Sequence, residues 1–430
     1  MMFHRCVRKI GLGKIIVLLV IAIIALQILH FYSLTYMNSK ESDPGEKRQH
    51  ERVPTKLSSS SRKIIQRLQH SHLMDSSGSY YLIRNLLSPE SDISRSDQVN
   101  DHSSVTLVTQ CSANHLDDLV DLTERWDAAI SISVFTYDSD FPFAIKAILY
   151  SYKCFNKIRS KVYLNMIYPI GRPPSISDIE QISLDEINCE VPFKNLRTTN
   201  KDNYDVSGIE YPHNILRNFA IKGGNTPYVF VVDIDMIPSS NLLQEFQAFI
   251  KRRKQSLDMR SSNDHKVAFV VPSYEVRESI KIPETKEILL TEIKSGNVRP
   301  FYAEACERCQ KQTVYSEWEK LVDVKFLDVG YSVDWKDPWE PFFITDRELP
   351  LYDERFKQYG FNRISQVCEM HIAGYRFDVL NNAFLVHKGF KFAGKFHKGK
   401  EEELNKNRIL FRSFKEELKS RYPDSTRRCY

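Results

Sequence analysis

The sequence has little of several residue types that mark specialised classes of protein. Its 15 glycines and 18 prolines among 430 residues are too few for a collagen-like or low-complexity chain. Its eight cysteines are too sparse for a small domain held together mainly by disulfides. No repeat with a fixed period of about 20–50 residues is present, which argues against solenoids and propellers.

An excess of charge of one sign is also missing. Lysine and arginine total 60 and aspartate and glutamate 55, so the formal net charge is +5. A balance this even does not indicate nucleic-acid binding, and no nucleic-acid partner is expected. Hydrophobic residues make up 42% of the chain, which is near the globular norm and excludes disorder of the whole chain. One large enzyme domain fits this length as well as several smaller domains do.

The N-terminal region contains a long apolar run. Residues 15–36 include no residue that is charged at neutral pH, and as a helix they would span about 33 Å, enough to cross a bilayer. Residues 1–14 carry basic residues and no acidic ones, so the positive-inside rule predicts a cytosolic tail and a lumenal remainder. A cleaved signal peptide is the alternative, but the run is long and lacks a small-residue cleavage pattern. We predict a single-pass type II membrane protein with a signal anchor at 15–36.

This topology predicts oxidising surroundings for every cysteine except Cys6. The other seven are odd in number, so at least one stays free or pairs with another chain, and their connectivity is left open. Cys306 and Cys309 have the spacing of half a zinc site. No second pair follows at finger spacing, so a disulfide or free thiols are favoured over a metal. No permissive Asn-x-Ser/Thr acceptor occurs, and no N-glycan is expected.

Residues 37–103 have the composition of a stem. They are rich in serine and in mixed charge, and such a segment buries too little apolar surface to offset the entropy of ordering. Residues 62–68 could form a short helix, and residues 80–87 are apolar enough to dock onto the domain that follows.

From residue 104 onward, strand-like and helix-like patterns alternate. This alternation predicts an α/β fold, Rossmann-type, with a mostly parallel sheet flanked by helices. Short continuous apolar runs such as 229–232 are typical of strands covered on both faces. We expect one lumenal domain over residues 104–430, which ends in a charged helix from about residue 401 to residue 421.

Two acidic residues follow the most apolar of these strands. Side chains at positions i and i+2 of a strand share a face, so Asp233 and Asp235 would repel each other and favour a cation. Mn²⁺ or Mg²⁺ prefers such oxygen ligands and keeps positions open for phosphate. Ligands of open α/β sheets bind beyond the carboxyl ends of strands. The pattern therefore indicates a metal site for a nucleotide diphosphate. In the alternative reading the two aspartates only cap a turn.

The segment around these aspartates, YPHNILRNFAIKGGNTPYVFVVDIDMIPS at 211–239, resembles the donor site of a known family. The family comprises the glycosyltransferases related to beta-1,4-glucuronyltransferase 1 and includes the second domain of the LARGE xylosyl- and glucuronyltransferases. The resemblance continues in residues 105–126, in DWKDPWEPFFI at 334–344, and in the long block at 352–391. Together these blocks cover most of residues 104–395 in order.

The resemblance implies a GT-A fold and a Golgi membrane protein with a lumenal catalytic domain. It implies Mn²⁺-assisted transfer of glucuronic acid from UDP-glucuronic acid, with Mg²⁺ as the alternative ion. The acceptor would be a β-linked xylose on the O-mannosyl glycan of dystroglycan, joined in β1,4 linkage with inversion. Two alternatives stay open. One is a transferase of N-acetylglucosamine or xylose on the same scaffold, and the other is a non-catalytic partner of other Golgi glycosyltransferases.

The expected metal ligands are Asp233 and Asp235, and the resemblance adds His387 at the end of an apolar run. A histidine bound only to backbone is the alternative for the third position. Lys388 or Lys391 would pair with the diphosphate as a point charge.

Three more residues are candidates for contact with the donor nucleotide. Arg217 and Asn218 lie on the helix before the metal strand and would hold a phosphate or the uridine. Gln110, at the end of the first strand of the domain, would meet the uracil ring. A surface ion pair or a turn residue is the plain alternative for each.

Inversion by a single displacement needs a base for the proton of the acceptor hydroxyl. Glu369 is favoured slightly over Glu354, and Asp353 is a third candidate. The alternative for these acids is an ion pair with Arg355 or Arg363.

Aromatic and basic residues complete the expected site. Trp335 and Trp339 would form a platform for the acceptor sugar or would anchor their loop in the core. Arg363 is a candidate for the carboxylate of the donor sugar, because a guanidinium binds a carboxylate with two parallel hydrogen bonds.

Overall fold

The computed structural model describes residues 27, 59–89, 101–196, 204, 208–257, 266–322, 325–393 and 399–429. The chain divides into two units, Met1–Lys56 and Leu57–Tyr430, and the description below concerns the second. No helix within the described ranges is both long and apolar enough to cross a membrane. Apart from Gln27, the predicted signal anchor at 15–36 lies outside the described residues.

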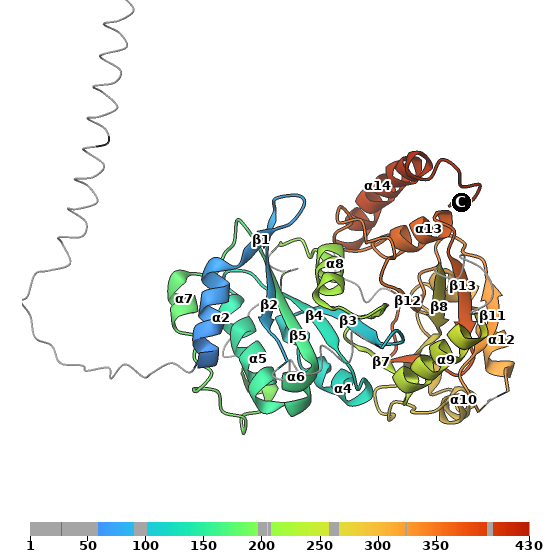
Figure 1. Ribbon diagram of the computed structural model, residues 1–430, viewed down its shortest axis with the longest axis horizontal. Coiled ribbons are helices and arrows are strands. Elements are labelled where there is room, and N and C mark those ends of the chain that lie inside the picture. Colours follow the sequence, from blue (N-terminus) through green and yellow to red (C-terminus); the bar gives the residue numbers. More distant parts are fainter. Residues whose placement is uncertain are drawn as a thin grey trace, which may run out of the picture. The chain divides into compact units, whose positions relative to one another are not determined.

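A large mixed sheet forms the centre of the second unit (Figure 1). Its order is β1-β2-β5-β4-β3-β6-β12-β8-β13-β11. The strands are β1 His72–Met74, β2 Tyr80–Leu87, β3 Val105–Ser112, β4 Ile130–Phe135, β5 Val162–Pro169, β6 Tyr228–Val231, β8 Val267–Val271, β11 Val329–Val333, β12 Phe342–Asp346 and β13 Arg376–Leu380.

The α/β class is confirmed, but the expectation of a mostly parallel sheet is wrong. Neighbours β5, β4, β3 and β6 run parallel, as do β8 and β13. Strand β12 inserts antiparallel between β6 and β8, and β1, β2 and β11 add antiparallel pairs at the two edges. The parallel centre is the part with continuous apolar strands, since every residue of β3 and β4 is buried.

Helices surround this sheet. They are α2 Ser59–His70, α4 Asp118–Arg125, α5 Phe141–Cys154, α6 Asn156–Lys161, α7 Ile176–Glu180, α8 His213–Gly223, α9 Leu242–Leu257, α10 Lys286–Lys294, α11 Glu307–Gln310, α12 Tyr315–Lys320, α13 Ile364–Ile372 and α14 Lys400–Arg421. Apolar faces hold them to the strands. For example, Phe246 and Phe249 of α9 pack edge-on against Phe269 of β8.

A second, smaller sheet positions the candidate site. Its order is β10-β9-β14-β7, formed by Val298–Pro300, Ser273–Val276, Leu385–Lys388 and Met236–Pro238. Strand β7 begins directly after Asp235 and pairs antiparallel with β14, so that His387 lies opposite Met236. This pairing brings the end of β14 to the acidic turn that follows β6.

The folded unit begins earlier than the predicted boundary at residue 104. Ile64 and Leu68 of α2 and Ile83 and Leu86 of β2 are buried in the main core. Strand β2 pairs antiparallel with β5, and Figure 1 shows α2 in blue beside β1 and β2. The helix expected near residues 62–68 and the docking of residues 80–87 are both present. The predicted stem at 37–103 therefore contains a helix and two strands of the domain.

Three disulfides join described cysteines: Cys154–Cys189, Cys306–Cys309 and Cys368–Cys429. Cys306 and Cys309 bond to each other, in line with the preference for a disulfide or thiols over a metal. Cys111 is the free cysteine of the described residues, as the odd number requires. Burial raises the pKa of its thiol, and nearby Asp118 and Asp117 raise it further, so the group stays protonated and inert.

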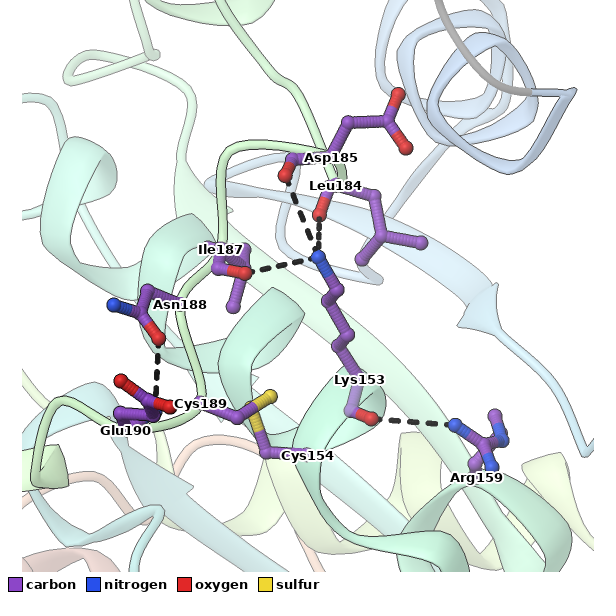
Figure 2. Close-up of a disulfide and its surroundings, with 9 residues drawn as sticks. All are labelled: Lys153, Cys154, Arg159, Leu184, Asp185, Ile187, Asn188, Cys189 and Glu190. Atoms are coloured by element: carbon purple, nitrogen blue, oxygen red, sulfur yellow. Dashed lines mark hydrogen bonds between the residues drawn. A yellow bond between two sulfur atoms is a disulfide. The ribbon is translucent and has the colours of Figure 1, made fainter.

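The Cys154–Cys189 disulfide fastens the end of α5 to the loop that follows α7 (Figure 2). Beside it, the Lys153 ammonium donates hydrogen bonds to the backbone oxygens of Leu184, Asp185 and Ile187 at 3.1, 3.4 and 2.9 Å. The bond closes a loop with a sequence separation of 35 residues, a length for which cross-linking stabilises a fold by roughly 4 kcal/mol. This loop precedes the segment that leads into α8.

The early start of the domain predicts a sharp difference between two truncations. Residues 57–430, secreted behind a signal sequence, should fold. Residues 104–430 should not, because β5 would lose its partner β2 and the core would lose α2. Secretion yield and thermal unfolding measure the difference.

A point variant tests the same feature without truncation. Within residues 57–430, Ile83→Ala should lower the free energy of unfolding by about 2–4 kcal/mol. The matched change at exposed Leu73 should cost under about 0.5 kcal/mol. If residues 104–430 were as stable as residues 57–430, the N-terminal strands β1 and β2 would be dispensable.

Candidate active site

A cavity of about 610 Å³ lies beyond the carboxyl end of β6. Its lining includes Gln110, His213, Arg217, Asp233, Glu340 and Arg363. Strands β3 and β6 are parallel neighbours, so their ends meet at this edge of the sheet, while α8 supplies His213 and Arg217. A second cavity of about 700 Å³ is lined by Asn218 and Glu354 and does not include Asp233.

Asp233 is held by two arginines. Its Oδ2 atom lies 2.6 Å from Nη2 of Arg363, and its Oδ1 atom lies 3.4 Å from Nη2 of Arg217. Burial alone would raise the pKa of Asp233, but the charges of Arg363 and Arg217 outweigh burial and keep this pKa well below its ordinary value. Asp233 is therefore a fixed negative charge at any physiological pH.

Asp235 and His387 form the part of the site that suits a metal. The Nε2 atom of His387 lies 3.0 Å from Oδ2 of Asp235, and the Nδ1 atom lies 2.7 Å from the backbone oxygen of Gly389. A neutral imidazole has one N–H, so it cannot donate to both acceptors. If Nδ1 donates to the oxygen of Gly389, the lone pair of Nε2 points toward Asp235 and can bind a cation together with the carboxylate. This tautomer is the usual one for a metal-binding histidine.

The predicted three-ligand cluster is not gathered around one point. Among the described residues, no group of three or more His, Cys, Asp or Glu side chains is arranged to hold a metal. The expectation that Asp233 and Asp235 share a strand face is wrong, since β6 ends at Val231 and the two residues lie in a tight turn. In this turn the backbone N–H of Met236 donates to the oxygen of Asp233 at 3.0 Å. Asp233 faces the arginines, and Asp235 faces His387.

The predicted donor contacts are only partly brought together. Gln110 and Arg217 line the cavity, and Gln110 accepts a hydrogen bond from the Tyr211 hydroxyl. Asn218 lies outside it, because the next residue on a helix points about 100° away. Its side chain bonds the backbone N–H and oxygen of Tyr352 at 2.9 and 2.8 Å.

Lys388 is also outside the cavity. Successive side chains on a strand point to opposite faces, so Lys388 is exposed on the side of β14 away from His387. The other predicted lysine, Lys391, lies close to the metal pair, with its Nζ atom 3.6 Å from Oδ2 of Asp235.

Neither acid that the sequence favoured as the base reaches this cavity. Glu369 accepts hydrogen bonds from Arg421 at 2.6 Å and from the Tyr422 hydroxyl at 3.0 Å, between α13 and the end of the chain. Glu354 lines the other cavity and accepts from Ser76 at 2.7 Å and from Asn218 at 3.0 Å. The carboxylates of Glu369 and Glu354 therefore make contacts within the protein, outside the cavity that contains Asp233.

The third candidate base and its expected partner form a separate surface network. Asp353 pairs with Arg355, which also pairs with Glu417 of α14 at 2.6 Å. This network borders the second cavity and not the one that contains Asp233.

The two tryptophans anchor their loop and do not form a platform. Both are buried, and Trp335 donates from Nε1 to the backbone oxygen of Trp339 at 2.9 Å. Trp339 donates to the Thr313 hydroxyl at 3.0 Å. The residues that this loop presents to the cavity are Pro338 and Glu340.

The cavity residues that sequence reasoning missed include Glu340 and His213. Burial raises the pKa of Glu340 to about 7, against the lowering effect of Arg363. Burial and then the charge of Arg217 lower the pKa of His213 to about 3, so its ring is neutral, and its buried Nδ1 atom has no hydrogen-bond partner. Glu340 is part of the family block at 334–344, between Trp339 and a proline. Local sequence does not show which side chain of a loop faces inward.

Comparison with known proteins now identifies the family. The family profile described as "Glycosyl-transferase for dystroglycan" matches residues 104–423. The chain belongs to this family. It is 38% identical to beta-1,4-glucuronyltransferase 1 of Danio rerio, over 98% of this chain and 99% of that protein. It is 39% identical to the Homo sapiens protein of the same name, over 83% of each.

More distant relatives agree with this assignment. LARGE1 of Homo sapiens, a xylosyl- and glucuronyltransferase, is 26% identical over 74% of this chain and 35% of its own length. Among solved structures, GalNAc-T7 with UDP, GalNAc and Mn²⁺ matches with a TM-score of 0.36 and 10% identity, over 75% of this chain and 51% of that one. A structural match this distant supports no conclusion. The family and its curated members show that the protein is a glycosyltransferase.

The Asp235–His387 pair predicts a metal-binding phenotype that needs no turnover. In residues 57–430 with UDP, Asp235→Ala and His387→Ala should each weaken Mn²⁺ binding by about tenfold or more, as measured by calorimetry. Lys388→Ala, on the opposite face of the same strand, should leave Mn²⁺ affinity unchanged. Wild-type affinity in both site variants would rule out this metal site.

Proposed function

We propose that the protein transfers glucuronic acid from UDP-glucuronic acid to a xylose residue, in β1,4 linkage and with inversion. The observation that carries the proposal is the similarity to proteins named beta-1,4-glucuronyltransferase 1, which in one case extends over 98% of the chain. The blocks that form the cavity, including the turn at Asp233 and the loop at Glu340, lie inside the matched family region 104–423.

The charge of the cavity supports a donor that carries an extra carboxylate. Five basic side chains line it, Arg217, Arg308, Arg363, Lys400 and Arg408, against three acidic ones, Asp233, Glu340 and Glu401. A sugar nucleotide brings a diphosphate, and glucuronic acid adds one more negative charge. A donor with a neutral sugar, such as N-acetylglucosamine or xylose, would neutralise less of the positive charge of these basic side chains.

The donor set at the edge of the cavity suits Mn²⁺, with Mg²⁺ as the alternative. Asp235 and His387 would hold the ion, and Phe301, which lines the cavity, packs against His387 with ring centres 5.8 Å apart. Carboxylate oxygen and imidazole nitrogen are both ligands that Mn²⁺ accepts. When bound, such an ion neutralises charge on the diphosphate as UDP departs. Gly389 orients the imidazole, and Lys391 adds a second positive charge.

The protein is proposed to work in the Golgi lumen as a type II membrane protein, anchored by residues 15–36. The disulfides of the described residues support an oxidising compartment. The description of the family, which names dystroglycan, supports a glycan acceptor on a glycoprotein of that type. Other Golgi glycosyltransferases are proposed as partners, since one of them must supply the xylose.

A donor panel tests the proposed reaction. Residues 57–430 with Mn²⁺ and a β-xyloside should release UDP from UDP-glucuronic acid at least about tenfold faster than from UDP-N-acetylglucosamine or UDP-xylose. NMR of the product should show glucuronic acid β-linked to position 4 of xylose. Preference for another donor, or an α-linked product, would contradict the proposal.

Removal of metal gives an independent prediction. EDTA should abolish transfer and added Mn²⁺ should restore it, because the departing diphosphate needs its charge neutralised. The melting temperature should change little, since the core does not depend on the ion. Full activity in EDTA would indicate that Lys391 and the arginines alone stabilise the leaving group.

A further inference from the structure

Glu340 lies on a firmly held piece of backbone. Its N–H donates to the backbone oxygen of Cys309 at 2.9 Å, and its own backbone oxygen accepts from Nε2 of Gln310 at 3.2 Å. On one side of it the indole of Trp339 is fully buried, and on the other β12 begins at Phe342. The backbone hydrogen bonds of Glu340, the buried Trp339 before it and strand β12 after it thus fix the position of its side chain in the cavity.

Its carboxylate is unlike the other acids considered for the site. Asp233, Asp235, Glu354 and Glu369 each accept a hydrogen bond or form an ion pair. Within the described part of the chain, the Glu340 side chain has neither. A base must offer an unoccupied oxygen to the proton that it removes. Glu401 also lines the cavity without such a contact among the described residues, but it is exposed on α14. Glu340 is the acid that the surrounding backbone holds in a fixed place in the cavity.

We infer that Glu340 is the general base of the transfer reaction, an inference that rests on the proposed function. The 4-hydroxyl oxygen of the acceptor xylose attacks the anomeric carbon of the donor and forms the new O–C1 bond. The bond from C1 to the β-phosphate oxygen breaks, and UDP leaves with its electron pair. The hydroxyl proton passes to the Glu340 carboxylate, which later returns it to water.

The electrostatics of the cavity agree with this role. Burial raises the pKa of Glu340 to about 7, Arg363 and Arg217 oppose the rise, and Asp233 adds to it. A base works best when its pKa lies near the pH at which the enzyme operates, because it is then both available and strong enough. Deprotonated Glu340 is the active form, so the rate should fall as the pH drops below about 7.

A conservative variant tests the assignment. Glu340→Gln keeps the size of the side chain and removes the base, so kcat should fall by about 100–10,000-fold, while the Kd for UDP stays within about threefold. Glu319→Gln is the matched control, since burial also raises the pKa of Glu319 but this acid lies outside the cavity. Its kcat should stay within about twofold of the wild type.

Two further readouts separate a base from a structural or donor-binding residue. Formate, a small carboxylate, should restore part of the activity of Glu340→Ala. The fall in wild-type kcat/KM at low pH should disappear from the residual activity of Glu340→Gln. Near-normal kcat in Glu340→Gln would overturn the inference, and so would a loss that appears mainly as weaker binding of UDP.

The test stays valid if the proposed donor is wrong. All variants are compared on whichever UDP-sugar the wild type uses best. Transfer of another sugar by the wild type would refute the donor proposal alone, and the comparison of Glu340→Gln with the wild type on that sugar would still decide the role of Glu340.

Discussion

The negative charge of Asp233 organises the cavity. A carboxylate at the end of a buried strand is costly without partners, and removal of one partner from such a buried pair typically costs 3–5 kcal/mol. Arg217 reaches Asp233 from α8, the element before β6, and Arg363 reaches it from the residue before α13, so one charge joins three segments, one of them 130 residues away in the sequence. Arg363 also packs over the ring of Phe342 at 4.0 Å, which ties the start of β12 to the same point.

The local sequence pattern was enough to locate the helices and strands of this arrangement, but it did not show whether neighbouring strands run parallel or antiparallel. The apolar run before Asp233, the helix that carries Arg217 and the strand that ends at His387 are all visible in sequence. The antiparallel insertion of β12 is not, because a short apolar strand reads the same in either direction. The strand β6 also ends before Asp233, so the two aspartates take separate partners where a continued strand would have placed them together.

The choice among the acids failed for a different reason. Glu369 lies on a helix inside the family block at 352–391, but its contacts come from Arg421 and Tyr422, 52 and 53 residues later. Residues 80–87 read as a segment that docks on the domain, whereas they form a strand of its sheet because β5 offers a free edge. Long-range pairing decides such cases, and a single sequence does not report it.

Two acids in one cavity are driven toward opposite protonation states. The arginines hold the pKa of Asp233 well below its ordinary value, while burial raises the pKa of Glu340 to about 7. A group fixed as an anion serves to position charge, and a group that changes state near neutrality can accept and release a proton. Pairs of titratable groups whose pKa values are pushed apart by their surroundings are a recurring basis for division of labour in enzymes. In this cavity Asp233 thus holds the cationic side chains, and Glu340 is the group suited to proton transfer. Asp233 lies in the turn after β6 and Glu340 in the loop before β12, and the antiparallel pairing of β12 with β6 places these two segments next to each other.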